Sequence, residues 1–237
     1  MSSIPKPECT AKLPSPALTV VASNTDESEL NDDSTKHDGR KRSFPHERGI
    51  WASYVFVDCS DIDGLRSIQQ ECKTFLDAGT TIDFRLVDHL HLSLTKTFTI
   101  HHHNIASLVD NLQELLTVQK NFRLEYEGLE VYVNEERTRT FLGVRVARAS
   151  CDTLETLVTS LDECMEQYKL PKFYTQRSFH VSILWCLDDR EEEIRAHLPA
   201  LTDVFEQVYE EEYGEMNKPV RKLCFKCGNK TFYFQLA

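Results

Sequence analysis

Two short copies of one polar pattern stand out as residues able to carry out chemistry. The sequence reads HLSL at residues 91–94 and HVSI at 180–183, so each copy places a histidine and a serine two positions apart among aliphatic residues. On a β-strand, residues two apart leave the same face, and the aliphatic residues between them enter the core. Two such strands would therefore aim two imidazoles and two hydroxyls at one cleft.

Two histidines and two serines suit cleavage of a phosphodiester without a metal ion. One of the two histidines, His91 or His180, would take the proton of the attacking hydroxyl, and the other would protonate the leaving oxygen. Each role is worth on the order of 10²- to 10⁴-fold in rate. An imidazole pKa of about 6.5 leaves both protonation states accessible near neutral pH. Ser93 and Ser182 would donate hydrogen bonds to non-bridging phosphate oxygens. If the substrate is RNA, its own 2′-OH can attack and leave a 2′,3′-cyclic phosphate, and the pattern assigns neither histidine to a single role.

Structural roles are the alternative for these residues. A single histidine in a strand is more often a satisfied core or edge residue, and a serine can instead bind nearby backbone groups. The recurrence of the same frame in both halves of the chain favours catalysis for His91 and His180. Other histidines lie at 89 and 101–103, but no carboxylate or cysteine has metal-ligand spacing beside them. We therefore predict no metal site and no cofactor.

The elements that must position these residues follow from hydrophobic periodicity. Aromatic and β-branched runs or alternation predict strands. The predicted strands are 51–58, 90–95, 122–133, 140–146, 180–186, 220–226 and 231–236. Apolar residues at helical spacing predict helices near 65–79, 105–116, 154–165 and 189–213. The expected fold is α+β, with two pseudo-symmetric lobes whose antiparallel sheets line a central cleft and whose helices lie outside.

Domain boundaries follow from composition. Residues 1–46 are rich in Ser, Thr, Pro, Asp and Glu, which predicts a disordered tail because little apolar surface is available to offset the entropy of ordering. Residues 47–237 would form one domain of two lobes. The longest apolar runs are far too short to span a bilayer and the start lacks a secretory pattern, so we expect an intracellular protein with no membrane partner.

The charge distribution narrows the class of partner. The net charge is −11, but the segment 188–215 alone carries two basic and eleven acidic residues, and residues 1–48 carry seven and eight. The remainder, which holds both motifs, has eighteen basic and nineteen acidic residues. A nearly neutral region suits recognition of a few nucleotides better than tracking of a long polyanion, which needs many Lys and Arg contacts.

Longer matches resemble the U6 small nuclear RNA phosphodiesterase family, within the two-histidine phosphoesterase superfamily. They are FY at 173–174 followed by SFHVSILWC at 178–186, RTRTFLG at 137–143, HH at 102–103 and KCGNK at 226–230. The resemblance covers residues 50–237. It implies a metal-independent 3′-to-5′ exoribonuclease that trims the oligouridine 3′ tail of U6 snRNA. Such a nuclease would act as a hydrolase or a lyase, in the nucleus, and would serve mRNA splicing. The end left behind would be a cyclic phosphate or a 3′-phosphate.

The resemblance also implies roles for single residues. His91 and His180 would be catalytic acid and base, Ser93 and Ser182 phosphate ligands, and Tyr174 the ring on which a terminal base stacks, a contact worth about 1 to 3 kcal/mol. A core tyrosine is the alternative for Tyr174. Ser178 would add a contact to the nucleotide. Residue 135 would also touch the substrate, but it is Glu135 where the resembled pattern has glutamine, which puts the nucleotide preference in doubt.

Two other functions stay open at this point. One is a 2′,3′-cyclic phosphodiesterase of RNA processing that uses water as the nucleophile. The other is a non-catalytic module that binds RNA 3′ ends, with the histidines as hydrogen-bond donors. In each case the partner is RNA, and we expect a monomer. A basic cluster at residues 40–42 is compatible with nuclear import but is also an ordinary solvated charge.

Overall fold

The computed structural model describes residues 20–22 and 49–237. In this part of the chain, strands and helices are interleaved along the sequence. The strands are β1 (Val20–Ala22), β2 (Ile50–Asp58), β3 (Arg85–Leu86), β4 (His91–Ser93), β5 (Phe98–His101), β6 (Phe122–Arg123), β7 (Tyr126–Val133), β8 (Arg139–Val146), β9 (His180–Leu187), β10 (Pro219–Val220), β11 (Lys222–Cys227) and β12 (Lys230–Gln235). The helices are α1 (Asp63–Gly79), α2 (His102–Thr117), α3 (Arg148–Gln167), α4 (Glu191–Arg195), α5 (Leu198–Glu211) and α6 (Tyr213–Met216).

One antiparallel sheet runs through both lobes. Its strand order is β1-β12-β11-β2-β4-β9-β8-β7, with β5 paired to β2 and β3 paired to β9, while β6 and β10 form a separate pair. The predicted α+β class with antiparallel sheet is therefore confirmed. The lobes meet where β4, from the first half of the chain, pairs with β9, from the second.

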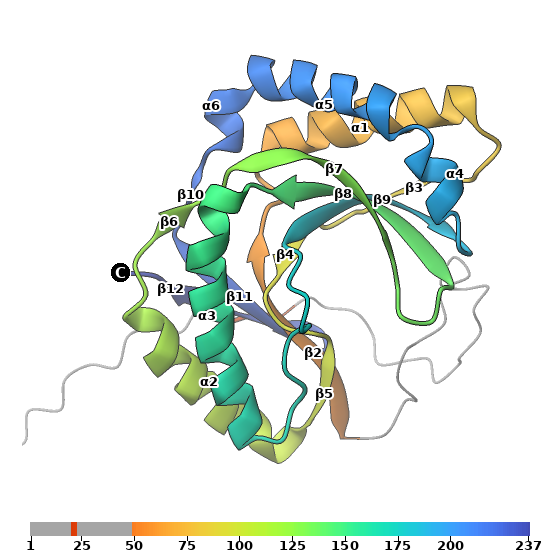
Figure 1. Ribbon diagram of the computed structural model, residues 1–237. Coiled ribbons are helices and arrows are strands. Elements are labelled where there is room, and N and C mark those ends of the chain that lie inside the picture. Colours follow the sequence, from red (N-terminus) through yellow and green to blue (C-terminus); the bar gives the residue numbers. More distant parts are fainter. Residues whose placement is uncertain (1–19, 23–48) are drawn as a thin grey trace, which may run out of the picture.

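The helices cover the sheet in two pairs, and each pair combines both halves of the chain. In Figure 1, α2 and α3 lie side by side over the part of the sheet that contains β11 and β12, and α1 lies with α5 above β7, β8 and β9. Each helix buries one apolar stripe; in α1 the stripe is Leu65, Ile68, Cys72 and Leu76, all fully buried. Because α1 follows a strand of one lobe and packs on the other, burial of its stripe ties the lobes together.

Two predicted elements are divided in the structure. The helix predicted over 189–213 is broken into α4, α5 and α6, and the break between α4 and α5 comes just before Pro199 in the first turn of α5. Proline lacks an N–H and its ring clashes with the carbonyl four residues earlier, so it disfavours one continuous helix through this point and is tolerated in the first turn of a new one. The strand predicted over 122–133 is divided into β6 and β7, and β6 pairs with β10 instead of joining the main sheet.

The predicted disordered tail lies mostly outside the described residues. Within it, Val20–Ala22 form β1, which pairs antiparallel with β12. The basic cluster at 40–42 also lies outside the described residues. Across residues 20–22 and 49–237, no helix is both long and apolar enough to cross a bilayer.

Candidate active site

The two His-x-Ser motifs lie on neighbouring strands. β4 and β9 run antiparallel with Leu92 opposite Val181, and both of these side chains are buried. Side chains alternate along each strand, so this register sets His91 opposite Ser182 and Ser93 opposite His180 on the other face. Each imidazole therefore neighbours the hydroxyl of the other motif. The motifs lie side by side in one sheet.

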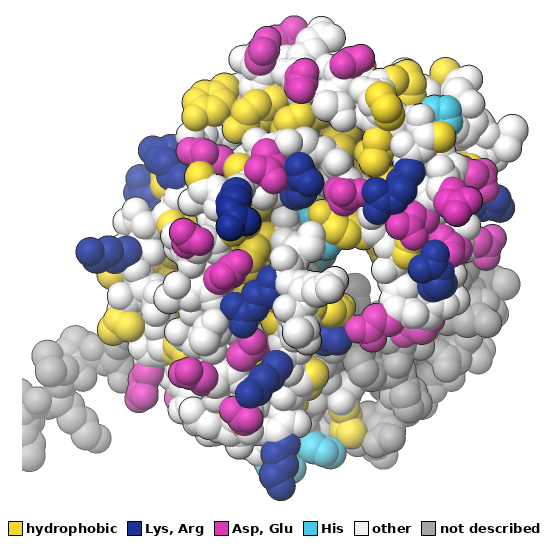
Figure 2. Space-filling model, viewed as in Figure 1, with side chains coloured by type: hydrophobic (Ala, Val, Ile, Leu, Met, Phe, Trp, Pro, Cys, Tyr) yellow, Lys and Arg dark blue, Asp and Glu magenta, His cyan; other side chains and the backbone are white. Residues whose placement is uncertain are grey.

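One pocket collects most of the predicted site residues. Its lining includes both histidines and both serines of the motifs, together with Ser178 and Tyr174. The remaining lining residues are Thr95, Lys96, Thr97 and Phe173. Glu135 does not line this pocket, but it accepts a hydrogen bond from Lys96 Nζ at 2.8 Å and so borders the site through that lysine. Figure 2 shows a hollow in the surface between the β7–β8 hairpin and the segment that precedes β9.

The backbone selects the same tautomer in both histidines. Nδ1 of His91 lies 2.9 Å from the carbonyl oxygen of His89, and Nδ1 of His180 lies 2.9 Å from that of Ser178. A carbonyl oxygen can only accept, so Nδ1 must be the protonated nitrogen in each neutral ring. Nε2 is then left with its lone pair for proton transfer, and the two halves of the chain repeat this arrangement.

Burial lowers the pKa of both imidazoles. The pKa of His180 falls to about 4, chiefly because burial penalises the charged form, and a charge on His91 lowers it further. The pKa of His91 is lowered for the same first reason, while the nearby carboxylate of Asp58 raises it. At neutral pH the free protein thus holds two neutral imidazoles in the pocket.

A second layer supports His91. His89 stacks on His91 with ring centroids 5.5 Å apart, and its Nε2 lies 3.3 Å from Oδ1 of Asp58. The hydrogen bond from His89 holds the pKa of Asp58 well below its usual range. Phe56 meets the rings of both histidines edge-on.

A different contact supports His180. The ring of Tyr132, from β7, stacks on His180 with centroids 3.6 Å apart and planes 13° from parallel. The hydroxyl groups of Ser178 and Tyr132 lie 3.3 Å apart. Tyr132 and Gly143 were not predicted as site residues. The signal that could have indicated them is a glycine inside a strand, which marks close approach of another group.

The segment between α3 and β9 carries Tyr174. Oδ1 of Asp162 accepts from the N–H of Phe173 at 2.7 Å, and its Oδ2 pairs with Arg177 at 3.1 Å. Tyr174 lies between these two anchors with 45% of its surface exposed. Nζ of Lys96 lies 4.2 Å from the centre of the Tyr174 ring, a cation–π distance. An accessible aromatic face therefore borders the pocket from an anchored segment.

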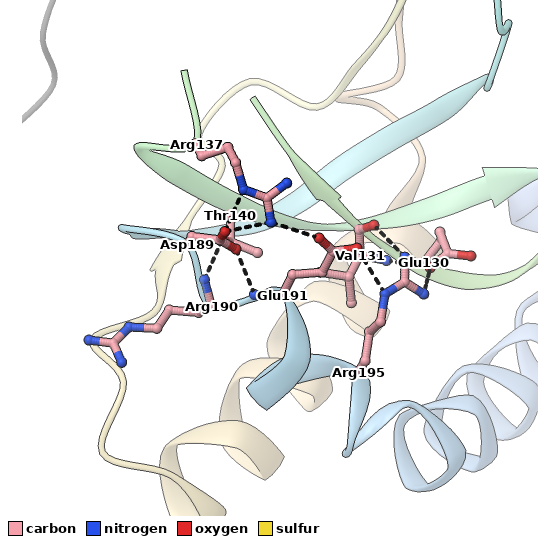
Figure 3. Close-up of polar contacts among 8 residues, drawn as sticks. All are labelled: Glu130, Val131, Arg137, Thr140, Asp189, Arg190, Glu191 and Arg195. Atoms are coloured by element: carbon pink, nitrogen blue, oxygen red, sulfur yellow. Dashed lines mark hydrogen bonds and ion pairs between the residues drawn. The ribbon is translucent and has the colours of Figure 1, made fainter. Parts of the chain in front are cut away.

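The hairpin between β7 and β8 is fixed by charge pairs (Figure 3). Arg137, in left-handed backbone geometry with φ of 51°, pairs with Asp189 and Glu191, and Arg195 joins Glu191 to Glu130. Arg137 is thus committed to carboxylates, and its pKa is raised by the hydrogen bond to Asp189.

Metal ligands do not gather anywhere in the described part of the chain. Across residues 20–22 and 49–237, no group of three or more His, Cys, Asp or Glu side chains lies close enough together to hold an ion. His102 and His103, which are among the residues that match the family, are exposed at the start of α2 and do not line the pocket.

A family model and proteins of known name match most of this chain. A family model described as HVSL, an uncharacterised conserved protein, matches residues 11–235. Two proteins named U6 snRNA phosphodiesterase 1 are each 35% identical to this chain. The one from Drosophila melanogaster matches 86% of this chain and 77% of its own length, and the one from Danio rerio 96% and 82%.

A solved structure has the same fold. It is Kluyveromyces marxianus Usb1 with uridine monophosphate, which superposes with a TM-score of 0.54 at 16% identity over 80% of this chain and 99% of the other. The likeness to this structure concerns the fold, and the likeness to the two sequence relatives extends along most of each chain.

Proposed function

This chain belongs to the U6 snRNA phosphodiesterase 1 family, and on that premise we propose that it is a 3′-to-5′ exoribonuclease that trims the oligouridine tail of U6 snRNA. The observation that carries the proposal is the pair of matched imidazoles in one pocket. Each has its Nδ1 held by a backbone carbonyl, so each has Nε2 free for proton transfer. This arrangement supplies one base and one acid without a metal ion.

The reaction needs only groups that the pocket and the RNA provide. The 2′-oxygen of the penultimate nucleotide attacks phosphorus while one histidine takes its proton. The bond from phosphorus to the 5′-oxygen of the last nucleoside breaks, and the other histidine protonates that oxygen. The products are a chain one nucleotide shorter with a 2′,3′-cyclic phosphate and a released nucleoside with a 5′-OH. This step consumes no water and is a lyase reaction; opening of the cyclic end by water would be hydrolysis.

The surroundings of the two histidines favour one assignment. His180 has the pKa near 4 and stays neutral, so we assign it as the base that accepts the 2′-OH proton. His91 lies close to Asp58, whose charge stabilises the imidazolium, so we assign it as the acid. A bound phosphodiester carries a negative charge, which raises the pKa of both rings and helps His91 to hold its proton.

The other pocket residues bind and orient the RNA end. Ser93 and Ser182 each neighbour the histidine of the other motif, from where their hydroxyls donate to the non-bridging phosphate oxygens. Tyr174 offers its exposed ring to the terminal base, and Ser178 adds a hydrogen bond to the nucleotide. Lys96 supplies a positive charge at the rim, which Glu135 partly neutralises.

Turnover of a defined RNA in EDTA tests the proposal. The wild type should shorten an oligouridine-tailed RNA and leave a cyclic end, and a 2′-deoxy residue at the penultimate position should block removal of the last nucleotide. His91→Ala or His180→Ala should each lower the rate by on the order of 10²- to 10⁴-fold with the fold intact. Retained activity in either variant would refute the mechanism. Cleavage of 2′,3′-cyclic phosphates alone would indicate the cyclic phosphodiesterase, and tight binding without turnover would indicate the binding module.

We also propose a nuclear, monomeric enzyme that acts in mRNA splicing through U6 snRNA, with residues 47–237 as the catalytic domain after a tail, residues 1–46, that is disordered apart from β1. The substrate named for the relatives supports the role in splicing and the nuclear location, and the composition of residues 1–46 supports the domain boundary. Imaging of a tagged chain, light scattering of the purified protein and limited proteolysis test the location, the oligomeric state and the domain boundary in turn. Exclusion from the nucleus, a dimer mass or a protease-resistant tail would contradict the corresponding part.

A further inference from the structure

A tyrosine from one strand reaches over the next strand to touch a histidine on the third. Tyr132 lies on β7 and His180 on β9, with β8 between them. The residue of β8 beneath the contact is Gly143, which pairs with Glu130 on one side and Ser182 on the other. The ring of Tyr132 crosses this glycine and lies flat on the imidazole, 3.6 Å between centroids.

The missing side chain of Gly143 leaves the space that the Tyr132 ring occupies. A Cβ on this residue would lie 2.9 Å from Cε2 of Tyr132 and 3.2 Å from Cδ2 of His180. Both atoms belong to the two stacked rings. Any larger residue at 143 would therefore have to push the tyrosine and the histidine apart or aside.

We propose that Tyr132 is a positioning residue that fixes the plane of His180, and that Gly143 is kept small to admit it. The inference rests on the proposed function, since it matters for catalysis only if His180 transfers a proton. Tyr132 does not line the pocket and its ring lies on His180, so it acts through the histidine.

One hydrogen bond does not fix the orientation of an imidazole. The bond from Nδ1 to the carbonyl of Ser178 holds one atom of the His180 ring, and the plane of the ring can still tilt about that contact. A flat neighbour at 3.6 Å removes this freedom. The electron-rich face of the tyrosine also favours the imidazolium that forms when His180 accepts a proton.

The ring contacts of the other motif are longer, including the stack of His89 on His91. The rings around His91 are those of Tyr54, Phe56 and His89, at 5.4 to 5.6 Å between centroids and tilted by 22° to 75°. The charged and titratable groups beside His180 are His91 on β4, Tyr132 on β7 and Arg145 on β8, which pairs with Glu127 at 3.1 Å. The contact with Tyr132 thus distinguishes His180 from His91.

Two substitutions at Tyr132 separate the ring from its hydroxyl. Tyr132→Phe keeps the stack and loses only a hydrogen bond between neutral groups, so kcat should stay within about threefold of wild type. Tyr132→Leu keeps an apolar side chain but no flat face, and kcat should fall by on the order of 10²-fold with KM for the RNA unchanged. Equal losses in both variants would overturn the proposal, because the hydroxyl would then be the group that matters.

Gly143→Ala tests the same stack from the other side. It should lower kcat about as much as Tyr132→Leu does. In the Tyr132→Leu background, where the ring is gone, the alanine should cause a much smaller further loss, because only its contact with His180 remains and residues that act through one contact are not additive. Multiplicative losses in the double variant would show that Gly143 acts independently and would refute the role given to it.

An NMR pH titration of the His180 imidazole gives a readout that does not depend on turnover. The pKa of His180 should be the same in wild type and Tyr132→Phe and lower in Tyr132→Leu, because the leucine excludes water without stabilising the imidazolium. An unchanged pKa together with normal kcat in Tyr132→Leu would overturn the inference. If instead the wild type fails to shorten RNA, the proposed function fails, and the titration still decides whether the stack governs His180. Urea unfolding of each variant identifies any loss of fold.

Discussion

The carboxylate of Asp162 should set how well the segment around Tyr174 is held. Asp162 lies on α3 with only 8% of its surface exposed, and it binds the N–H of Phe173 with one oxygen and Arg177 with the other. Arg177 also donates to the carbonyl of Glu155 and the hydroxyl of Thr159 on the same helix. One buried side chain thus anchors both ends of the segment that presents the ring to the pocket.

The geometry sets the expected cost of Asp162→Ala. The change removes one charge-assisted hydrogen bond and leaves the N–H of Phe173 without its acceptor. The side chain of Arg177 is 24% exposed and keeps two acceptors, so its charge is not stranded. We therefore expect a loss of about 2 to 3 kcal/mol in the free energy of unfolding. Asp162→Asn keeps an oxygen for Phe173 and should cost about 1 kcal/mol.

Loosening of the segment should weaken RNA binding more than catalysis. Base stacking on an aromatic ring is worth about 1 to 3 kcal/mol, and a mobile Tyr174 loses part of this, so KM should rise by up to about tenfold in Asp162→Ala. Because the histidines lie on β4 and β9, kcat should stay within about threefold of the wild-type value.

Urea unfolding and steady-state kinetics on an oligouridine substrate measure both effects. Exposed Asp152 on the same helix provides the control, and Asp152→Ala should change neither stability nor KM. A destabilised Asp162→Ala with unchanged KM would show that the anchor does not govern Tyr174. A variant as stable as wild type would refute the energetic reasoning itself.

Three further predictions concern the pocket. Burial lowers the pKa of His91 and brings that of His180 to about 4, so kcat/KM should peak on the acid side of pH 6.5. The free energy of unfolding should fall as the pH drops from about 6.5 towards 4, because in this range the unfolded chain binds protons that the folded chain does not. Glu135→Gln should free the charge of Lys96 and lower KM by up to about fivefold, a gain that added salt removes, because the pair is largely exposed. Tyr174→Phe should bind oligouridine as the wild type does, whereas Tyr174→Ala should bind it about 5- to 100-fold more weakly in a titration with labelled RNA.

The Glu135→Gln prediction has a direct control. Glu136→Gln removes the next carboxylate of the hairpin, which bonds to Asn134 and not to Lys96, and should leave KM unchanged. A kcat/KM optimum well above pH 7, an unchanged KM in Glu135→Gln, or equal binding by Tyr174→Ala and wild type would each contradict the corresponding argument.

Local hydrophobic periodicity was sufficient to predict most helices and strands. It failed where contacts between residues far apart in the chain determine the structure. The strands that carry both motifs and the helices α1 and α2 were predicted close to their observed bounds, because apolar spacing records which face each element buries. Helix α3 was predicted near 154–165 but already begins at Arg148. The single helix predicted over 189–213 was wrong, since the apolar stripe continues through a break that Pro199 favours. The short strands β3, β5 and β10 are two to four residues long, too short to leave a periodic signal.

Histidine and serine two apart on a strand must share a face, so alternation within a few residues was enough to predict that each motif points both polar groups the same way. Which groups meet across strands was decided only by the tertiary structure. The pairing of Leu92 with Val181 joins residues far apart in the chain, and the stack of Tyr132 on His180 requires three strands in one register with Gly143 between. The register of the strands depends on how both lobes bury their cores together, and no local sequence pattern shows this.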